Sequence, residues 1–200
     1  MIRGPDVWYA ADVSYYGTNI FMPQILGTIF GQGETIYAIS WQSLAITAVG
    51  LPGCVAAILC LKCFGNRWLD IYGFLLCAVL FAAMATTYMI EPTASNLLFG
   101  ELMALTFALN FGPNVATFVL PAVAFPPQVR STFHGLSAGS GKIGAVVGTF
   151  IYGPLADAFG IATVMWVQCV LCLVGVVLSI YCIADDKPRT KGAGPRESLI

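Results

Sequence analysis

Two charged side chains stand inside apolar segments, where charge is costly, and they are the first candidates for a functional role. Lys142 follows Ser131 by eleven residues within an apolar, glycine-rich segment. If that segment is a helix that crosses a bilayer, the ammonium lies roughly 16 Å along it, about half of the hydrocarbon thickness. This is too deep for the side chain to snorkel to the interface. We therefore predict that Lys142 faces a cavity or a partner and marks a binding site.

The second charge, Asp12, belongs to a polar stripe near the start of the chain. Trp8, Asp12, Tyr16 and Asn19 are spaced so that they fall on one face of a helix. A polar stripe on a membrane helix points into a helix bundle or an aqueous cavity. Trp8 and the tyrosines have the alternative role of interfacial anchors, but that role leaves Asp12 unexplained.

No set of residues that would support catalysis accompanies these charges. His134 is the single histidine, so the sequence contains no His pair for a metal. No Ser-His-Asp set stands out either, because only this one histidine could belong to it. The sequence also has no Gly-rich phosphate loop followed by Lys and Ser or Thr. Cys60–Cys63 and Cys169–Cys172 have metal-like spacing, but cysteine in an apolar run behaves as a small hydrophobe. The sequence therefore predicts neither an enzyme nor a bound cofactor or metal.

The segments that must position these side chains are apolar. Of the 200 residues, 58% are hydrophobic and 10% are charged, whereas a soluble domain averages about 25% charged residues. Six segments are long enough to span a bilayer, at about 7–30, 36–62, 68–90, 97–122, 131–156 and 161–184. We therefore predict an all-α, multi-pass integral membrane protein in contact with lipid. A net charge of −1 argues against a nucleic-acid partner.

The charges outside the predicted spans indicate an orientation. If both termini are cytoplasmic, the basic residues outside the spans all face the cytoplasm: Arg3, Lys62, Arg67, Arg130, Lys187, Arg189, Lys191 and Arg196. The links on the other side carry Glu34, Glu91 and Asp157 and no Lys or Arg, which is the positive-inside pattern. Residues 1–184 are predicted to form a six-helix transmembrane bundle. Residues 185–200, which are polar with Gly and Pro, are predicted to form a disordered cytoplasmic tail.

Three further features predict how the spans are used. The fifth predicted span has small-xxx-small pairs that predict close helix packing, at Gly135, Gly139, Gly144 and Gly148. The third predicted span, 68–90, is interpreted as apolar scaffold. Glu101, in the outer turn of the fourth predicted span, is interpreted as a residue at a cavity mouth or as a snorkelling acid.

The stretch from Asn110 to Lys142 carries a family resemblance. Its motifs, in register, are Asn110-Phe111-Gly112-Pro113-Asn114, Thr117-Phe118, Pro121-Ala122, Phe125-Pro126, Arg130-Ser131-Thr132, His134-Gly135 and Ser140-Gly141-Lys142. They resemble the tenth and eleventh helices of the phosphate:proton symporters of the major facilitator superfamily. The spacing Trp8-x3-Asp12-x3-Tyr16 resembles the seventh helix of the same family. The resemblance covers roughly residues 4 to 184.

The resemblance implies a fold and a substrate. In that family these helices form the C-terminal six-helix half, built from two three-helix repeats, of a twelve-helix transporter that binds its substrate near the membrane midplane between the two halves. It implies that an N-terminal six-helix half or a second copy of the chain is needed to complete the pocket. It also implies inorganic phosphate and protons as partners and the plasma membrane as the location.

The resemblance also implies site residues, carried over position by position: Trp8, Asp12, Tyr16, Asn114 and Lys142. Lys142 would supply a positive charge to phosphate, and the indole, phenol and amide groups would supply neutral donors. The Asp12 carboxylate would repel the anion unless it is protonated or paired with Lys142. Asp12 is therefore the predicted proton-coupling residue.

This chain departs from the family pattern in its cytoplasmic links. Lys62 stands where the superfamily turn has Asp, and Val123 and Gln128 replace the Glu and the first Arg of the family sequence Pro-Ala-Glu-Ile-Phe-Pro-Ala-Arg. An alternative hypothesis is therefore a non-transporting six-helix remnant, or a regulatory partner of a full-length transporter. A third hypothesis, a facilitator for another anion, is disfavoured by the five-residue set.

Overall fold

The computed structural model describes residues 26–27, 30, 35–124 and 127–182. Of the first predicted span, Leu26, Gly27 and Phe30 are described, and all three are helical. Trp8, Asp12, Tyr16 and the predicted tail (185–200) lie outside the described residues.

The described part of the chain consists of helices and short links, without a strand. The helices are α2 (Ile36–Phe64), α3 (Asn66–Ile90), α4 (Ser95–Leu109), the π-helical turn η1 (Asn110–Asn114), α5 (Val115–Ala124), α6 (Arg130–Phe159) and α7 (Ile161–Cys182). Two predictions differ from this order. Asn66 and Arg67, predicted in a link, form the start of α3, and the fourth predicted span is divided by η1 instead of being one continuous helix.

Four described stretches are long and apolar enough to cross a membrane: Ile36–Leu61, Asn66–Ile90, Ser95–Val119 and Ile161–Tyr181. They coincide with the second, third, fourth and sixth predicted spans. At 30 residues, α6 is longer than any of them but less apolar, because it contains Lys142 and several glycines. The predicted fold class, an all-helical membrane protein, is confirmed.

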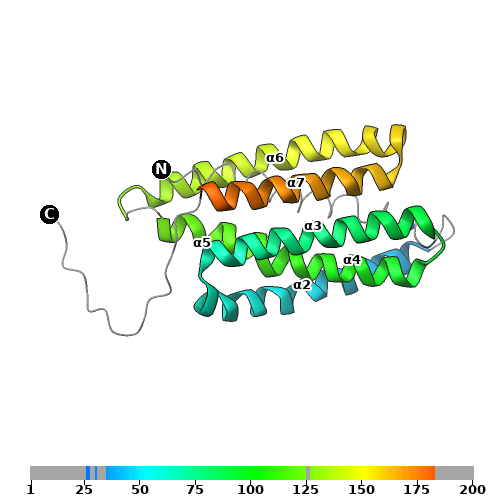
Figure 1. Cartoon of the computed structure of the whole chain (residues 1–200), viewed down its shortest axis with the longest axis horizontal. Coiled ribbons are helices and arrows are strands. Elements are labelled where there is room, and N and C mark those ends of the chain that lie inside the picture. Colours follow the sequence, from blue (N-terminus) through cyan, green and yellow to red (C-terminus); the bar gives the residue numbers. More distant parts are fainter. Residues whose placement is uncertain (1–25, 28–29, 31–34, 125–126, 183–200) are drawn as a thin grey trace.

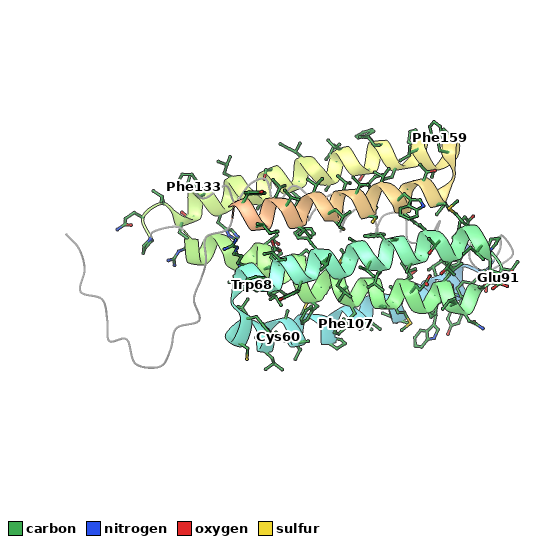
Figure 2. All side chains as sticks on the ribbon, in the orientation of Figure 1. Cys60, Trp68, Glu91, Phe107, Phe133 and Phe159 are labelled. Carbon is green, nitrogen blue, oxygen red and sulfur yellow. The ribbon has the colours of Figure 1, made fainter. Side chains whose placement is uncertain are left out.

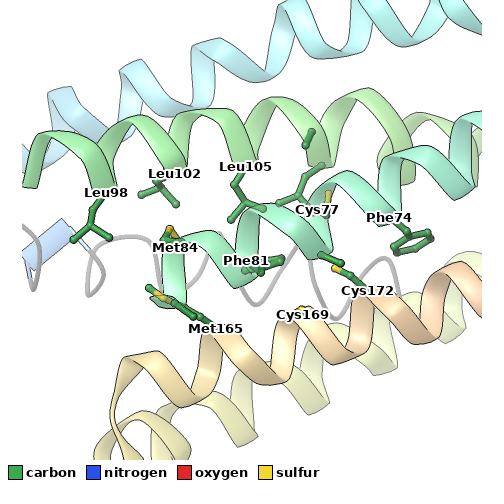
Figure 3. Close-up of a cluster of buried hydrophobic side chains, with 14 of the residues drawn as sticks. Phe74, Cys77, Phe81, Met84, Leu98, Leu102, Leu105, Met165, Cys169 and Cys172 are labelled. Atoms are coloured by element: carbon green, nitrogen blue, oxygen red, sulfur yellow. The ribbon is translucent and has the colours of Figure 1, made fainter. Parts of the chain in front are cut away.

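Helix α3 lies at the centre of the described bundle. It packs against α7 on one side and against α4, α2 and η1 on the other, as Figure 1 shows. The side chains buried at these contacts form one apolar core (Figure 3), which includes Phe74, Cys77, Phe81 and Met84 of α3, Leu98, Leu102 and Leu105 of α4, and Met165, Cys169 and Cys172 of α7. Cys169 and Cys172 thus pack among apolar side chains, in the role predicted for them.

Helix α6 lies at the edge of the described bundle, beside α7 and the short α5 (Figure 1). Phe118 of α5 and His134 of α6 are in ring contact, with centroids 6.4 Å apart. The predicted close packing at Gly135 and Gly139 is wrong: within the described structure, nothing lies within 4 Å of a Cβ built at either position. The reason is that α6 has only two described helical neighbours, and neither approaches closely at these turns.

Two of the links consist of a single glycine. Gly65 joins α2 to α3, and Gly160 joins α6 to α7, with φ angles of 79° and 84°. Glycine adopts this left-handed region without the steric cost of a Cβ. The N–H of each glycine also caps the preceding helix, by donating to the carbonyl of Leu61 or Ala156 at 3.1 and 2.9 Å.

The described charges separate towards the two ends of the bundle. The end of α2, the start of α3, the start of α6 and the end of α7 lie at one end, together with Arg67 and Arg130 (Figure 1). Glu91 and Asp157 belong to the opposite end, where Figure 2 labels Glu91 and Phe159. The basic and acidic links that were predicted to face opposite sides thus lie at opposite ends.

Candidate functional site

The fourth predicted span is interrupted where Pro113 enters it. Proline has no N–H, so the carbonyl of Leu109 cannot receive the hydrogen bond that residue 113 would donate in an α-helix. The helix instead widens into the π turn Asn110–Asn114, which contains Pro113. Single π turns inside α-helices occur frequently at functional sites. The Gly-Pro pair within an apolar run was the sequence signal for this break, and the expectation of a continuous helix overlooked it.

The π turn holds two amide side chains together. Asn110 is buried, and its Nδ2 donates to the carbonyl of Thr106 at 2.8 Å. Its Oδ1 accepts from Asn114 Nδ2 at 3.0 Å, and Cys54 Sγ of α2 approaches the same oxygen at 3.7 Å. Asn114 is half-buried, and its Nδ2 carries a second hydrogen for which no described residue is the acceptor. Asn110 therefore orients Asn114 while leaving it one N–H for a ligand.

Glycines of α2 and α3 allow the π turn to sit deep in the bundle. Gly73 of α3 and Gly112 of η1 are so close that a Cβ on either would overlap the backbone of the other. A Cβ on Gly53 would lie 2.7 Å from the carbonyl oxygen of Phe107, and one on Gly50 would lie 2.8 Å from Asn110 Nδ2. The close helix approaches of the described bundle are therefore here and not at Gly135 and Gly139 of α6.

Lys142 stands on a different helix from Asn114. It lies twelve residues after Arg130, the first residue of α6, or about 18 Å along the helix. Its side chain is exposed. No Cα of η1 lies within 8 Å of a Cα of α6, so the backbones that carry Asn114 and Lys142 are not in contact. The depth of Lys142 in its helix agrees with the sequence analysis, and its role as a ligand stays a prediction.

The structure also contains a buried acid that the sequence analysis missed. Asp70 lies in the segment interpreted as apolar scaffold, and it is 1% exposed, beside Ser179 of α7. The signal was available, because a carboxyl inside a predicted span is costly unless it has a partner. At the other end of α3, Thr87 donates to Glu101 Oε1 at 2.9 Å, so Glu101 connects α4 to α3.

Comparison with known proteins identifies the family. The profile of the Major Facilitator Superfamily matches residues 10–199. The chain belongs to this superfamily. The membership confirms the predicted resemblance, and it agrees with the prediction of a transporter and not an enzyme.

Relatives in the superfamily carry names that specify a substrate. The inorganic phosphate transporter PT2 of Toxoplasma gondii is 34% identical over 183 residues, which are 92% of this chain and 32% of that protein. The inorganic phosphate transporters 1-2 and 1-11 of Oryza sativa subsp. japonica are 36% and 37% identical over 162 and 160 residues, each covering 75% of this chain and 30% and 29% of the relative. The chain thus spans roughly a third of the length of these relatives.

Proposed function

We propose that this chain forms part of a phosphate:proton symporter and supplies the C-terminal wall of its substrate pocket. The observation that carries the proposal is the match to inorganic phosphate transporters over 92% of the chain, because a match of that length covers almost all of the predicted spans. The rest of the pocket would come from an N-terminal six-helix half or from a second copy of the chain, as superfamily members bind substrate between two halves.

The proposed phosphate ligands are Trp8, Asp12, Tyr16, Asn114 and Lys142. Lys142 would supply the positive charge that the anion requires, and its exposure at mid-helix supports this role. The N–H of Asn114 that no described residue accepts would be a neutral donor, held in place by its bond to Asn110. Trp8 and Tyr16, outside the described residues, would add an indole N–H and a hydroxyl.

Asp12 is proposed to couple proton entry to phosphate binding. An ionised carboxylate beside the anion would repel it, so phosphate would enter together with a proton on Asp12. We expect Asp12→Asn, which mimics the protonated state, to bind phosphate at all pH values and to lose pH-dependent uptake. Uptake of labelled phosphate as a function of external pH measures this, and an unchanged pH dependence would refute the role of Asp12.

The proposed setting is the plasma membrane, with both termini in the cytoplasm. The basic end of the described bundle, with Arg67 and Arg130, would then face the cytoplasm, as the positive-inside rule requires. Accessibility of cysteines to a membrane-impermeant thiol reagent tests the orientation: Cys63 is exposed near this end and should be labelled only in inside-out vesicles.

The test of the function is phosphate uptake by cells that express residues 1–200, alone and together with the N-terminal six helices of a full-length relative. We expect no uptake by the chain alone, because one wall does not enclose a substrate, and measurable uptake with the complementing half. In that pair, Lys142→Gln should weaken phosphate uptake about tenfold to a hundredfold, the effect of losing one charged hydrogen bond. Gly139→Ala, on an open face of the same helix, is the matched control and should leave uptake unchanged. Equal uptake by both variants would contradict the assignment of Lys142.

A further inference from the structure

The contact between α3 and α7 contains a carboxyl group that the proposed transport site does not use. Asp70 is the fifth residue of α3 and is 1% exposed, and Ser179 of α7 is fully buried. The Ser179 Oγ lies 2.6 Å from Asp70 Oδ2 and 2.8 Å from the carbonyl oxygen of Gly175. The helices are close here, because a Cβ on Gly175 would lie 2.7 Å from the ring of Phe74.

The number of hydrogens shared by these contacts depends on the charge of Asp70. A serine hydroxyl has one hydrogen and can donate it to one acceptor. If Ser179 donates to the Gly175 carbonyl, the short contact with Asp70 Oδ2 becomes a hydrogen bond only when Asp70 is the donor. If Ser179 donates to Asp70 instead, its oxygen lies 2.8 Å from the Gly175 carbonyl oxygen with no hydrogen between them. Both contacts are hydrogen bonds at once only when the carboxyl of Asp70 is protonated.

The surroundings of Asp70 favour the same state. Its second oxygen, Oδ1, is buried and receives no hydrogen bond from a described residue. The nearest described cation on its own helix, Arg67, directs Nη2 to the carbonyl of Ile180 at 3.0 Å. Helix α7 carries no Asp, Glu, Lys, Arg or His, and its titratable groups are Cys169, Cys172, Tyr181 and Cys182. An ionised carboxylate buried among such groups in a membrane would be strongly destabilising.

Among the described side chains, those of α4, η1 and α5 place no charge near Asp70. Glu101 of α4 bonds to Thr87 at the opposite end of α3, and η1 and α5 contain no ionisable side chain. Helix α2 ends close to the start of α3 and contributes Lys62, whose side chain is outside the described residues, together with thiols and Tyr37.

We propose that Asp70 and Ser179 form a proton-binding site between α3 and α7, distinct from the predicted coupling residue Asp12. In the bound state Asp70 Oδ2–H donates to Ser179, which donates to Gly175. On release the proton passes to water, the electron pair stays on the carboxylate, and one of the two short contacts loses its hydrogen. Deprotonation therefore weakens the contact between α3 and α7.

A route for the proton leads to the basic end of the bundle. Asn66 lies one turn before Asp70 on the same face of α3 and is also buried. Its Oδ1 and Nδ2, like Asp70 Oδ1, are buried polar atoms that have no hydrogen-bond partner in the part of the chain that the structure describes. Three such atoms are the number that a buried water usually binds. A water between Asn66 and Asp70 would connect the carboxyl to the end of α3.

The sign of the pH effect follows from the proton count. The folded chain holds a proton on Asp70 that the unfolded chain has released at neutral pH, so stability falls as pH rises. We would measure the thermal unfolding midpoint of the purified chain in detergent between about pH 5 and pH 9, for wild type and Asp70→Asn. Asparagine keeps a neutral donor to Ser179. The wild-type midpoint should fall by about 3 °C or more relative to Asp70→Asn as pH rises.

A control variant at the other end of α3 shows whether the pH effect comes from Asp70. Glu101→Gln removes the carboxyl that accepts from Thr87 at the opposite end of α3 and leaves the pair of Asp70 and Ser179 intact, so this variant should retain the wild-type difference from Asp70→Asn. Parallel curves for wild type and Asp70→Asn would overturn the proposal.

If Asp70→Asn does not fold, infrared spectroscopy at neutral pH provides the test. Wild type should show the C=O band of a protonated carboxyl, and this band should shift in Ser179→Ala. A band that does not shift, or the absence of the band in wild type, would refute the site.

Discussion

Helices α3 and α6 each carry an ionisable side chain within the bundle, but in opposite surroundings. Asp70 on α3 is enclosed between helices and bonded to Ser179, whereas Lys142 on α6 is exposed on a helix with two described neighbours. In sequence, both are ionisable residues inside predicted spans. The high cost of a charge inside a membrane helix indicates that each residue has a special role. Whether neighbouring helices cover the side chain then distinguishes a group that holds helices together, such as Asp70, from one exposed to a ligand, such as Lys142.

The largest difference in stability should appear when a methyl group is added beside α3 and, separately, on α6. Gly112→Ala places a Cβ into the backbone of Gly73 on α3, where neither helix can move aside cheaply. We expect a loss of stability at or above the upper end of the roughly 1–3 kcal/mol typical of overpacking. Gly139→Ala on α6 fills open space and should leave the midpoint unchanged or raise it slightly. Unfolding midpoints in detergent measure both effects. Equal midpoints would contradict the claim that α3 is tightly packed against η1 while α6 is open at Gly139.

A smaller effect is expected at the amide pair of the π turn. Asn110→Ala removes the oxygen that accepts from Asn114 and should cost about 1–2 kcal/mol of stability, the usual range for a lost hydrogen bond. If Asn110 acts on phosphate through Asn114, its removal should weaken phosphate uptake in the complemented transporter but add nothing once Asn114→Ala is present. A double-mutant cycle on uptake measures the coupling. Additive losses would mean that Asn110 has only a packing role.

The smallest effect on stability is expected at Lys142. Lys142→Gln changes an exposed side chain, so the free energy of unfolding should change by no more than about 0.5 kcal/mol, even though uptake falls. The unfolding midpoint in detergent measures this. A large loss of stability together with the loss of uptake would indicate that Lys142 supports the fold, and the contrast with Asp70 would disappear.

Much of the fold could be predicted from the sequence, because helix spans follow from local hydropathy. The spans at 36–62, 68–90 and 161–184 correspond to α2, α3 and α7 within a few residues. The pair Gly135 and Gly139 of α6 failed as a packing signal, because this motif makes a close contact only where another helix crosses it. The close packing predicted at Gly144 and Gly148, which are buried, stays a prediction. Gly73 and Gly112 meet through the pairing of α3 with η1, which no local pattern reveals.

The candidate site was predicted less completely. Asn114 and Lys142 came from the family resemblance, and the structure adds the reason why Asn114 is oriented, namely the bond to Asn110 in a turn widened by Pro113. Trp8, Asp12 and Tyr16 lie outside the described residues and stay predictions. The carboxyl of Asp70 within a predicted span was a signal that the sequence analysis did not use. Its pairing with Ser179, 109 residues away, exists only through the packing of α3 on α7 and could not be predicted.

The single-glycine links have a mechanical consequence. One residue spans at most about 3.5 Å, so the end of α2 cannot separate from the start of α3, and α6 is tied to α7 in the same way. The only freedom at each joint is rotation about the two torsions of Gly65 or Gly160. A displacement of the end of α2 is therefore passed directly to the start of α3, and a displacement of the end of α6 to the start of α7.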